Sequence, residues 1–131
     1  MKLSEQAGIQ EQWRLIDREK LLYMTAGDVG FLLEMIELFL SYVPQHMENV
    51  KQAIEECDSQ KLSHEAHACK GLIGNYTILE PYHLLVSLED DAKTGQLDKS
   101  LDKYNLLEKE ISQLIVELKM LVLQESNNVP S

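Results

Sequence analysis

The sequence predicts an all-α protein, an antiparallel up-and-down four-helix bundle with a short additional N-terminal helix. Apolar residues recur at spacings of three and four over several long segments of the 131-residue chain, which is the periodicity of amphipathic helices. Only three prolines and six glycines are present, too few for the many turns of an all-β fold. The connections between the last predicted helices are a few residues long, which favours antiparallel neighbours.

The chain length fits a single domain, and a hydrophobic content of 44% is enough for a core. We assign residues 11–124 to the bundle. The polar residues 1–10 are expected to form a flexible N-terminus, and residues 125–131 a flexible C-terminal tail.

The first two predicted helices each follow an aspartate that can cap their N-terminus. Asp17 is the expected N-cap of a short helix that runs to about Met24. Asp28 is the expected N-cap of the next helix, whose apolar pattern continues as far as Cys57. Pro44 lies inside this pattern and removes one backbone hydrogen bond, so we expect a kink there or, alternatively, a break into two helices.

The last three predicted helices have similar local signals at their ends. Asp58 precedes a helix that we expect to run to about Thr77. Pro81 suits the first turn of the following helix, and Gly95 suits its C-terminal end. Asp98 is expected to open the last helix. Its apolar residues alternate spacings of three and four: Tyr104, Leu107, Ile111, Leu114, Leu118 and Leu121.

The charge and the two cysteines limit the possible functions. A net charge of −10 argues against a surface for nucleic acid or for an anionic membrane. No run of about 18 apolar residues occurs, and residues 1–10 lack the apolar centre of a secretion signal, so we expect a cytoplasmic protein without a membrane span. Cys57 and Cys69 both fall on apolar helix stripes, and we expect two reduced, buried thiols.

The predicted helix over residues 59–77 carries a histidine beside its buried face. The apolar stripe of this helix recurs at spacings of four and three: Leu62, Ala66, Cys69, Ile73 and Tyr76. His67 lies next to this stripe, with Lys70 one turn later and Gly71 and Gly74 on the same side. Each glycine inside a helix costs about 1 kcal/mol relative to alanine, so two on one face require a reason. Clearing space for another protein to reach the imidazole is such a reason.

This pattern resembles the motif of the histidine phosphotransfer (HPt) domain of bacterial phosphorelays, in which Ala-His is followed after two residues by Lys-Gly and then by a further small residue. Five positions fit this motif: Ala66, His67, Lys70, Gly71 and Gly74. Segments within residues 26–58 and residues 88–95 are also similar to the family, and the likeness extends over about residues 15–123. The motif together with its context makes the resemblance specific.

The resemblance implies a phosphorelay intermediate that is not itself an enzyme. It implies that His67 accepts a phosphoryl group from a phospho-aspartyl receiver domain or a histidine kinase and passes it to an aspartate of a response regulator. The chain would hold no cofactor, because the catalytic Mg²⁺ would belong to the partner's receiver domain. No nucleotide-binding glycine loop or kinase motif occurs, so we expect no self-phosphorylation from ATP. We expect a monomer.

The residues around His67 have roles that can be argued from their chemistry. An imidazole has an ordinary pKa near 6.5, so much of it is unprotonated and nucleophilic at neutral pH. Lys70, three residues later, can neutralise phosphate oxygens, although an ordinary solvated lysine is the alternative. Gly71 and Gly74 are expected to admit the partner's surface, and close packing against a neighbouring helix is the alternative.

Two further residues are assigned through the resemblance. In some similar proteins, a glutamate in a Leu-Glu step of the next helix accepts a hydrogen bond from the second imidazole nitrogen. Leu88-Glu89 matches that step, while an ordinary surface acid is the alternative because the chain has 22 acidic residues. His64 precedes His67 by one turn, and we expect it at the rim of the docking surface.

Two other functions stay open at this point. His64 and His67 could share a metal ion with a third ligand such as His83, but the sequence is not the His-Glu-x-x-His zinc motif. An inert helical adaptor explains the amphipathic helices but not the two glycines. His46 and His83 have no supporting residues nearby in the sequence, and we expect both at helix surfaces.

Overall fold

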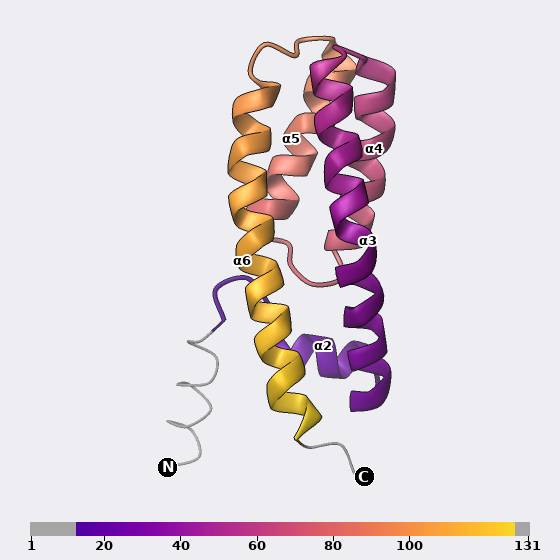
Figure 1. Ribbon diagram of the computed structural model, residues 1–131, viewed down its shortest axis with the longest axis vertical. Coiled ribbons are helices and arrows are strands. Elements are labelled where there is room, and N and C mark those ends of the chain that lie inside the picture. The colour runs from indigo at the N-terminus through magenta and orange to yellow at the C-terminus, as the bar shows by residue number, and fades with distance from the viewer. Residues whose placement is uncertain (1–12, 128–131) are drawn as a thin grey trace.

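The computed structural model describes residues 13–127, and within this range it contains five helices and no strands (Figure 1). The helices are labelled as in Figure 1 and have these bounds: α2, Arg18–Met24; α3, Val29–Glu55; α4, Ser59–Ile73; α5, Glu80–Thr94; and α6, Ser100–Ser126. The four long helices run alternately up and down, and the neighbouring pairs α3–α4, α4–α5, α5–α6 and α6–α3 pack together. The predicted all-α bundle with a short additional helix is confirmed.

The long helices differ in length, and this difference explains the place of α2. Helices α3 and α6 have 27 residues each, whereas α4 and α5 have 15. At about 1.5 Å of rise per residue, α3 and α6 are each longer by about 18 Å. In Figure 1, α2 lies between these extended ends, at the bottom of the bundle. The segment before α2 and α2 itself supply buried apolar side chains to this part of the core: Trp13, Leu15, Ile16 and Leu21.

Glutamates of α6 hold α2 and the segment that precedes it. The side chain of Glu117 is buried, and its Oε1 accepts hydrogen bonds from the backbone N–H groups of Leu15, at 2.9 Å, and Ile16, at 3.2 Å. Arg18 donates to Glu125 further along the same helix. A buried carboxylate is costly unless it is hydrogen-bonded, and these bonds supply the compensation.

The N-caps predicted at Asp17 and Asp28 are confirmed, and Asp58, which was expected to start the next helix, caps α4 in the same way. Asp17, Asp28 and Asp58 each accept a hydrogen bond from the backbone N–H three residues later, at 3.1, 3.0 and 3.0 Å. Each bond satisfies one of the free N–H groups at a helix start. Asp98 was expected to open the last helix, but α6 begins two residues later, at Ser100, and its N-cap residue Lys99 makes no side-chain capping bond.

The other helix ends agree with the sequence in part. Pro81 lies in the first turn of α5, and Gly95 ends α5 with a left-handed φ of 74°, as predicted. Helix α3 continues through Pro44, so the alternative of two separate helices is wrong. Helix α4 ends at Ile73, one turn before the predicted end at Thr77.

The C-terminal boundary needs a correction. Helix α6 runs to Ser126, and Glu125 is buried, so residue 125 belongs to the bundle and not to a tail. The ion pair between Glu125 and Arg18 is the physical reason. The predicted N-terminal segment 1–10 and residues 128–131 lie outside the described part of the chain.

The two cysteines are free, as predicted, but they differ in burial. Cys69 is buried in the core, and burial raises the pKa of its thiol to about 12. Cys57 is exposed, which contradicts the prediction of a buried thiol. Helix α3 ends at Glu55, and Cys57 lies in the following turn with a φ of 53°, so it leaves the apolar stripe of that helix.

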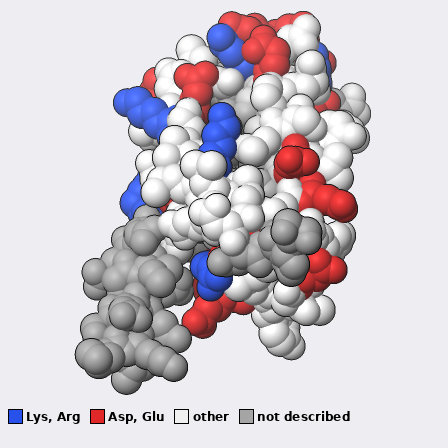
Figure 2. Space-filling view, turned by 60° about the horizontal axis from the view of Figure 1, so that its bottom comes forward, with Lys and Arg blue, Asp and Glu red and all other residues white. Residues whose placement is uncertain are grey.

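The surface carries charges of both signs. On the face drawn in Figure 2, acidic and basic side chains are interspersed over the upper part, with uncharged residues between them. None of the helices within residues 13–127 is long and apolar enough to cross a membrane.

Candidate functional site

Helix α4 places His67 at the edge of the core. Its neighbour Ala66 is fully buried with the rest of the apolar stripe, whereas the side chain of His67 is 70% exposed. The helix therefore fixes the backbone of His67 through packing and leaves the imidazole accessible. This side of α4 borders α5, which supplies the next residue of the site.

Glu89 of α5 brings His67 and Lys70 together. The Nδ1 of His67 lies 3.1 Å from Oε2 of Glu89, and the Nζ of Lys70 donates to Oε1 at 2.8 Å. Glu89 is only 7% exposed, so folding removes its carboxylate from water. The negative charge must then be compensated by these two partners. The two oxygens of one carboxylate thus connect two residues of α4 to α5.

The charges of this group determine which nitrogen of the neutral imidazole carries the proton. The hydrogen bond from Lys70 lowers the pKa of Glu89, helped by His67, although burial acts in the opposite direction. The same hydrogen bond to Glu89 raises the pKa of Lys70. Glu89 is therefore ionised at neutral pH and can only accept, so the neutral imidazole carries its proton on Nδ1. The lone pair of Nε2 is left for chemistry.

Lys70 is neither a free point charge nor an ordinary solvated lysine. Its side chain is 22% exposed, and its ammonium is engaged by Glu89. The sequence indicated a cation one turn after His67, but it did not show that a buried acid would hold this cation. The ion pair orients Lys70 beside the imidazole.

The two glycines of the motif differ in their surroundings. A Cβ at Gly71 meets no described atom within 4 Å, so the space beside this residue is open. At Gly74 a Cβ lies 3.2 Å from a ring carbon of Tyr82 in α5, so the clearance expected there is absent. Gly74 also ends α4 and is not inside it. The packing explanation, kept as the alternative for both glycines, applies to Gly74.

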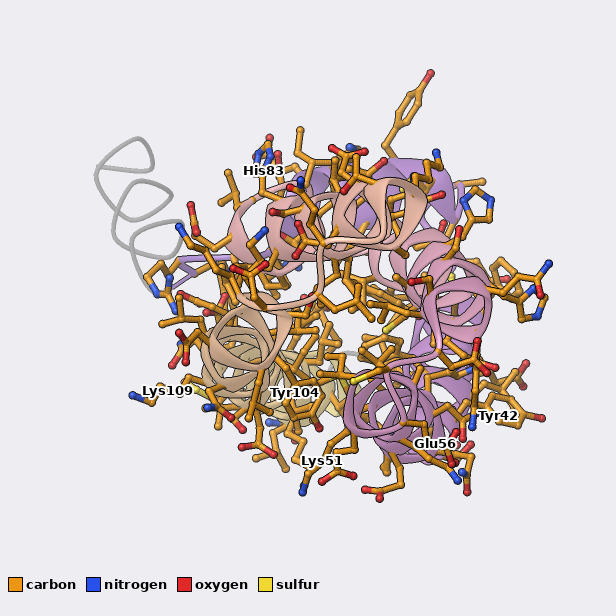
Figure 3. All side chains as sticks on the ribbon, turned by 90° about the horizontal axis from the view of Figure 1, so that it is seen from above. Tyr42, Lys51, Glu56, His83, Tyr104 and Lys109 are labelled. Carbon is orange, nitrogen blue, oxygen red and sulfur yellow. The ribbon has the colours of Figure 1, made fainter. Side chains whose placement is uncertain are left out.

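The other histidines contribute less to this site. His64 is exposed on α4, one turn before His67, and His83 is exposed on α5, where Figure 3 shows it at the periphery of the bundle. His46 is half-buried, and its Nδ1 is buried without a hydrogen-bond partner in the described residues, so it differs from the surface histidine that we expected. Over residues 13–127, no group of three or more His, Cys, Asp or Glu side chains has the arrangement of a metal site.

Sequence reasoning missed Lys93, which also lies beside the carboxylate. Its Nζ is 3.6 Å from Oε2 of Glu89, one helical turn along α5. The spacing of four residues between Glu89 and Lys93 is the signal that could have found it, because residues at this spacing are neighbours on a helix.

A four-helix bundle that presents one exposed imidazole, held by an acid of the next helix, is suited to carry a group on a histidine nitrogen. A model of the Hpt domain matches residues 34–117, which is more than half of the chain. The chain therefore belongs to the Hpt-domain family, and its role is histidine phosphotransfer in a two-component phosphorelay.

Two solved structures have the same fold. Histidine-containing phosphotransfer protein B of Pseudomonas aeruginosa PAO1 is 19% identical, with a TM-score of 0.78 over 85% of this chain and 96% of that chain. The HPT domain from the Hpt sensor hybrid histidine kinase of Shewanella is 16% identical, with a TM-score of 0.70 over 83% of this chain and 94% of that chain. Among curated protein sequences, none matches this chain.

Proposed function

We propose that His67 is the residue that carries the phosphoryl group, bound through Nε2. The observation that carries this proposal is the contact between Nδ1 of His67 and the buried carboxylate of Glu89, on an imidazole that is 70% exposed. This contact holds the proton on Nδ1 and leaves a nucleophilic nitrogen at the surface. His64 has no comparable carboxylate partner among the described residues.

The transfer step needs only the imidazole and an acyl phosphate. The lone pair of Nε2 attacks phosphorus, the bond from phosphorus to the aspartyl oxygen breaks, and the donor's carboxylate leaves with that electron pair. The proton stays on Nδ1, so the phosphorylated ring is an imidazolium. Its positive charge faces Glu89, which stabilises the product electrostatically. The reverse step delivers the group to the aspartate of a response regulator.

Lys70 neutralises charge that develops on the phosphoryl oxygens. Glu89 holds its ammonium near the imidazole, so part of the orientation is set before the partner arrives. Mg²⁺ and the acceptor aspartate come from the receiver domain of the partner. The open space at Gly71 lets that domain approach, and exposed His64 lies at the edge of the same surface.

The chain acts as a phosphocarrier without a kinase activity of its own. Its sequence contains no glycine loop for the phosphates of a nucleotide. The phosphoryl group therefore comes from a phospho-aspartate of a receiver domain, or from a histidine kinase acting in trans.

A transfer assay tests the proposed function. The purified chain is mixed with phosphorylated receiver domains from the same source in the presence of Mg²⁺, and a second sample receives ATP alone. We expect label to move to the chain from a receiver domain but not from ATP, and to be lost in acid and retained in alkali, as a phosphoramidate requires. An acid-stable label on the chain would contradict the proposal.

A further inference from the structure

Lys93 lies beside the carboxylate oxygen that faces His67. Its Nζ is 3.6 Å from Oε2 of Glu89, and Nδ1 of His67 is 3.1 Å from the same atom. We propose that Lys93 is a second phosphate-binding cation, which helps Lys70 to hold the phosphoryl group on His67. This inference rests on the proposed function, because it requires that His67 carries the phosphate.

Lys70 and Lys93 contact the carboxylate of Glu89 in different ways. Lys70 donates to Oε1 at 2.8 Å, a full hydrogen bond, and its side chain is 22% exposed. The distance of 3.6 Å from Lys93 to Oε2 is too long for a hydrogen bond, and its side chain is 63% exposed. The ammonium of Lys93 therefore keeps its donors for another acceptor and has room to move.

The charge balance of the site favours a second cation. Before transfer, one carboxylate faces two lysines and a neutral imidazole, so these groups have a net charge of about +1. The phosphoryl oxygens carry a charge of about −1.5 to −2, of which the imidazolium ring offsets only one unit, and Glu89 remains ionised beside them. Lys70 carries a single positive charge, which it would have to share between Glu89 and the phosphoryl oxygens. Lys93 approaches from α5, so the phosphate would be flanked by cations from two helices.

Other charges near the site do not replace Lys93. Asp90, which follows Glu89 on α5, is exposed and has the same sign as the phosphate.

A purely structural role for Lys93 is the alternative, because this lysine lies in the last turn of α5, where a cation stabilises the helix. Such a role would change stability and leave phosphotransfer unchanged, so the two roles can be separated.

The test compares Lys93→Ala and Lys93→Arg with the parent chain and with Lys109→Ala. Lys109 is an exposed lysine of α6, which Figure 3 shows at the periphery, so its replacement removes the same charge elsewhere. Each protein is phosphorylated by the same phospho-receiver domain. The transfer rate is measured first, and the phosphoryl group on His67 is then titrated by ³¹P NMR at neutral and alkaline pH.

We expect Lys93→Ala to slow transfer by about fivefold, the effect of one charge pair in partly solvated surroundings. The pKa of the phosphoryl group should rise, because its dianion loses a cation. Lys93→Arg should restore both values, and Lys109→Ala should change the rate by less than about twofold because solvent screens a distant charge.

The outcomes separate this inference from the proposed function. If the parent is phosphorylated on His67 and Lys93→Ala has the same rate and the same phosphoryl titration, the role of Lys93 is overturned and the proposed function stands. If the parent takes no phosphate on His67, both are overturned. A change in melting temperature alone, with transfer intact, would also overturn the role of Lys93, because it would show a structural lysine.

Discussion

His67 and Glu89 face each other across the packed helices α4 and α5, with Nδ1 of the imidazole 3.1 Å from Oε2 of the carboxylate. Their positions are 22 residues apart in the chain, and only the antiparallel packing of the two helices joins them. The relationship gives the imidazole one proton position and one orientation. It also explains why Glu89 is buried at the edge of the core.

Replacing Glu89 by glutamine should slow phosphotransfer. The amide is similar in size, but it has no charge to stabilise the imidazolium of the phosphorylated state. Loss of a carboxylate that supports a functional histidine commonly costs about 10- to 100-fold at metal sites, and we expect about tenfold here. Single-turnover transfer from a phosphorylated receiver domain measures the rate, with Glu108→Gln on α6 as the control. A rate equal to that of the parent would show that Glu89 has no role in the reaction.

The ion pairs of Glu89 should make part of the stability depend on pH. Its hydrogen bond with Lys70 lowers the pKa of the folded carboxyl below its ordinary value near 4.3. A lowered carboxyl pKa stabilises the fold above the ordinary pKa, and this contribution is lost as the pH falls through the folded pKa. The parent should therefore be more stable than Glu89→Gln at pH 7, and the difference should shrink below about pH 4. Thermal melts from pH 3 to 7 measure it; a difference that is constant over this range would refute the linkage.

The two glycines of the motif should respond differently to alanine. Gly71 has open space, so Gly71→Ala should stabilise α4 by up to about 1 kcal/mol. At Gly74 a Cβ would press on Tyr82, and the substitution should destabilise the fold by about 1 kcal/mol unless the ring moves away. Chemical unfolding of both variants provides the comparison.

Stability and phosphotransfer, measured together on two variants of Gly71, test whether this residue serves docking. Leucine at this position should leave the fold intact and block transfer, because it would cover the approach to the imidazole. A destabilised Gly71→Ala that transfers normally would argue for packing at Gly71 and against docking.

The buried carboxylate of Glu117 should contribute to stability through the segment before α2. Glu117→Ala leaves the N–H groups of Leu15 and Ile16 without their acceptor, at a cost of about 1–3 kcal/mol for each group that water does not reach. Glu117→Gln keeps an acceptor oxygen and should cost less. Urea unfolding with Glu108→Ala as the surface control would decide this. Equal stabilities for Glu117→Ala and Glu108→Ala would show that the segment is held by its apolar side chains alone.

Local signals in the sequence predicted most of the fold. Asp17, Asp28 and Asp58 cap helices because a side-chain oxygen can reach an N–H three residues later, whatever the rest of the chain does. Gly95 ends α5 for a similarly local reason, since it adopts a left-handed φ without a steric cost. Periodicity then gave the buried faces and the bundle.

The errors have causes outside the local sequence. Cys57 continues the apolar spacing of α3 but follows the end of that helix, so periodicity alone assigned it to the core. Glu125 looked like part of a polar tail, yet it pairs with Arg18, more than a hundred residues earlier. Gly74 was expected to provide clearance because the local sequence does not show its neighbour Tyr82, which belongs to another helix. In each case a partner distant in sequence, or the exact end of a helix, decided the outcome.

The residues of the candidate site also fall into two groups, those that a local sequence pattern predicts and those that it does not. The spacing of His67 and Lys70 on one helix could be recognised from the sequence, because it is a local pattern. The position of Glu89 came from the resemblance to a family and not from spacing. Lys93 was missed, because its relevance depends on where α5 lies relative to His67.

The central claim is that the phosphoryl group is carried by His67, and the most direct test is to map the phosphorylated residue with two matched variants. His67→Gln and His64→Gln each remove one exposed imidazole from α4, one turn apart, and both should fold because neither side chain lies in the core. Each is incubated with the phosphorylated receiver domain that labels the parent, and the acid-labile, alkali-stable phosphate on the chain is measured. We predict that His64→Gln is labelled and His67→Gln is not. Label on His67→Gln together with none on His64→Gln would contradict the assignment.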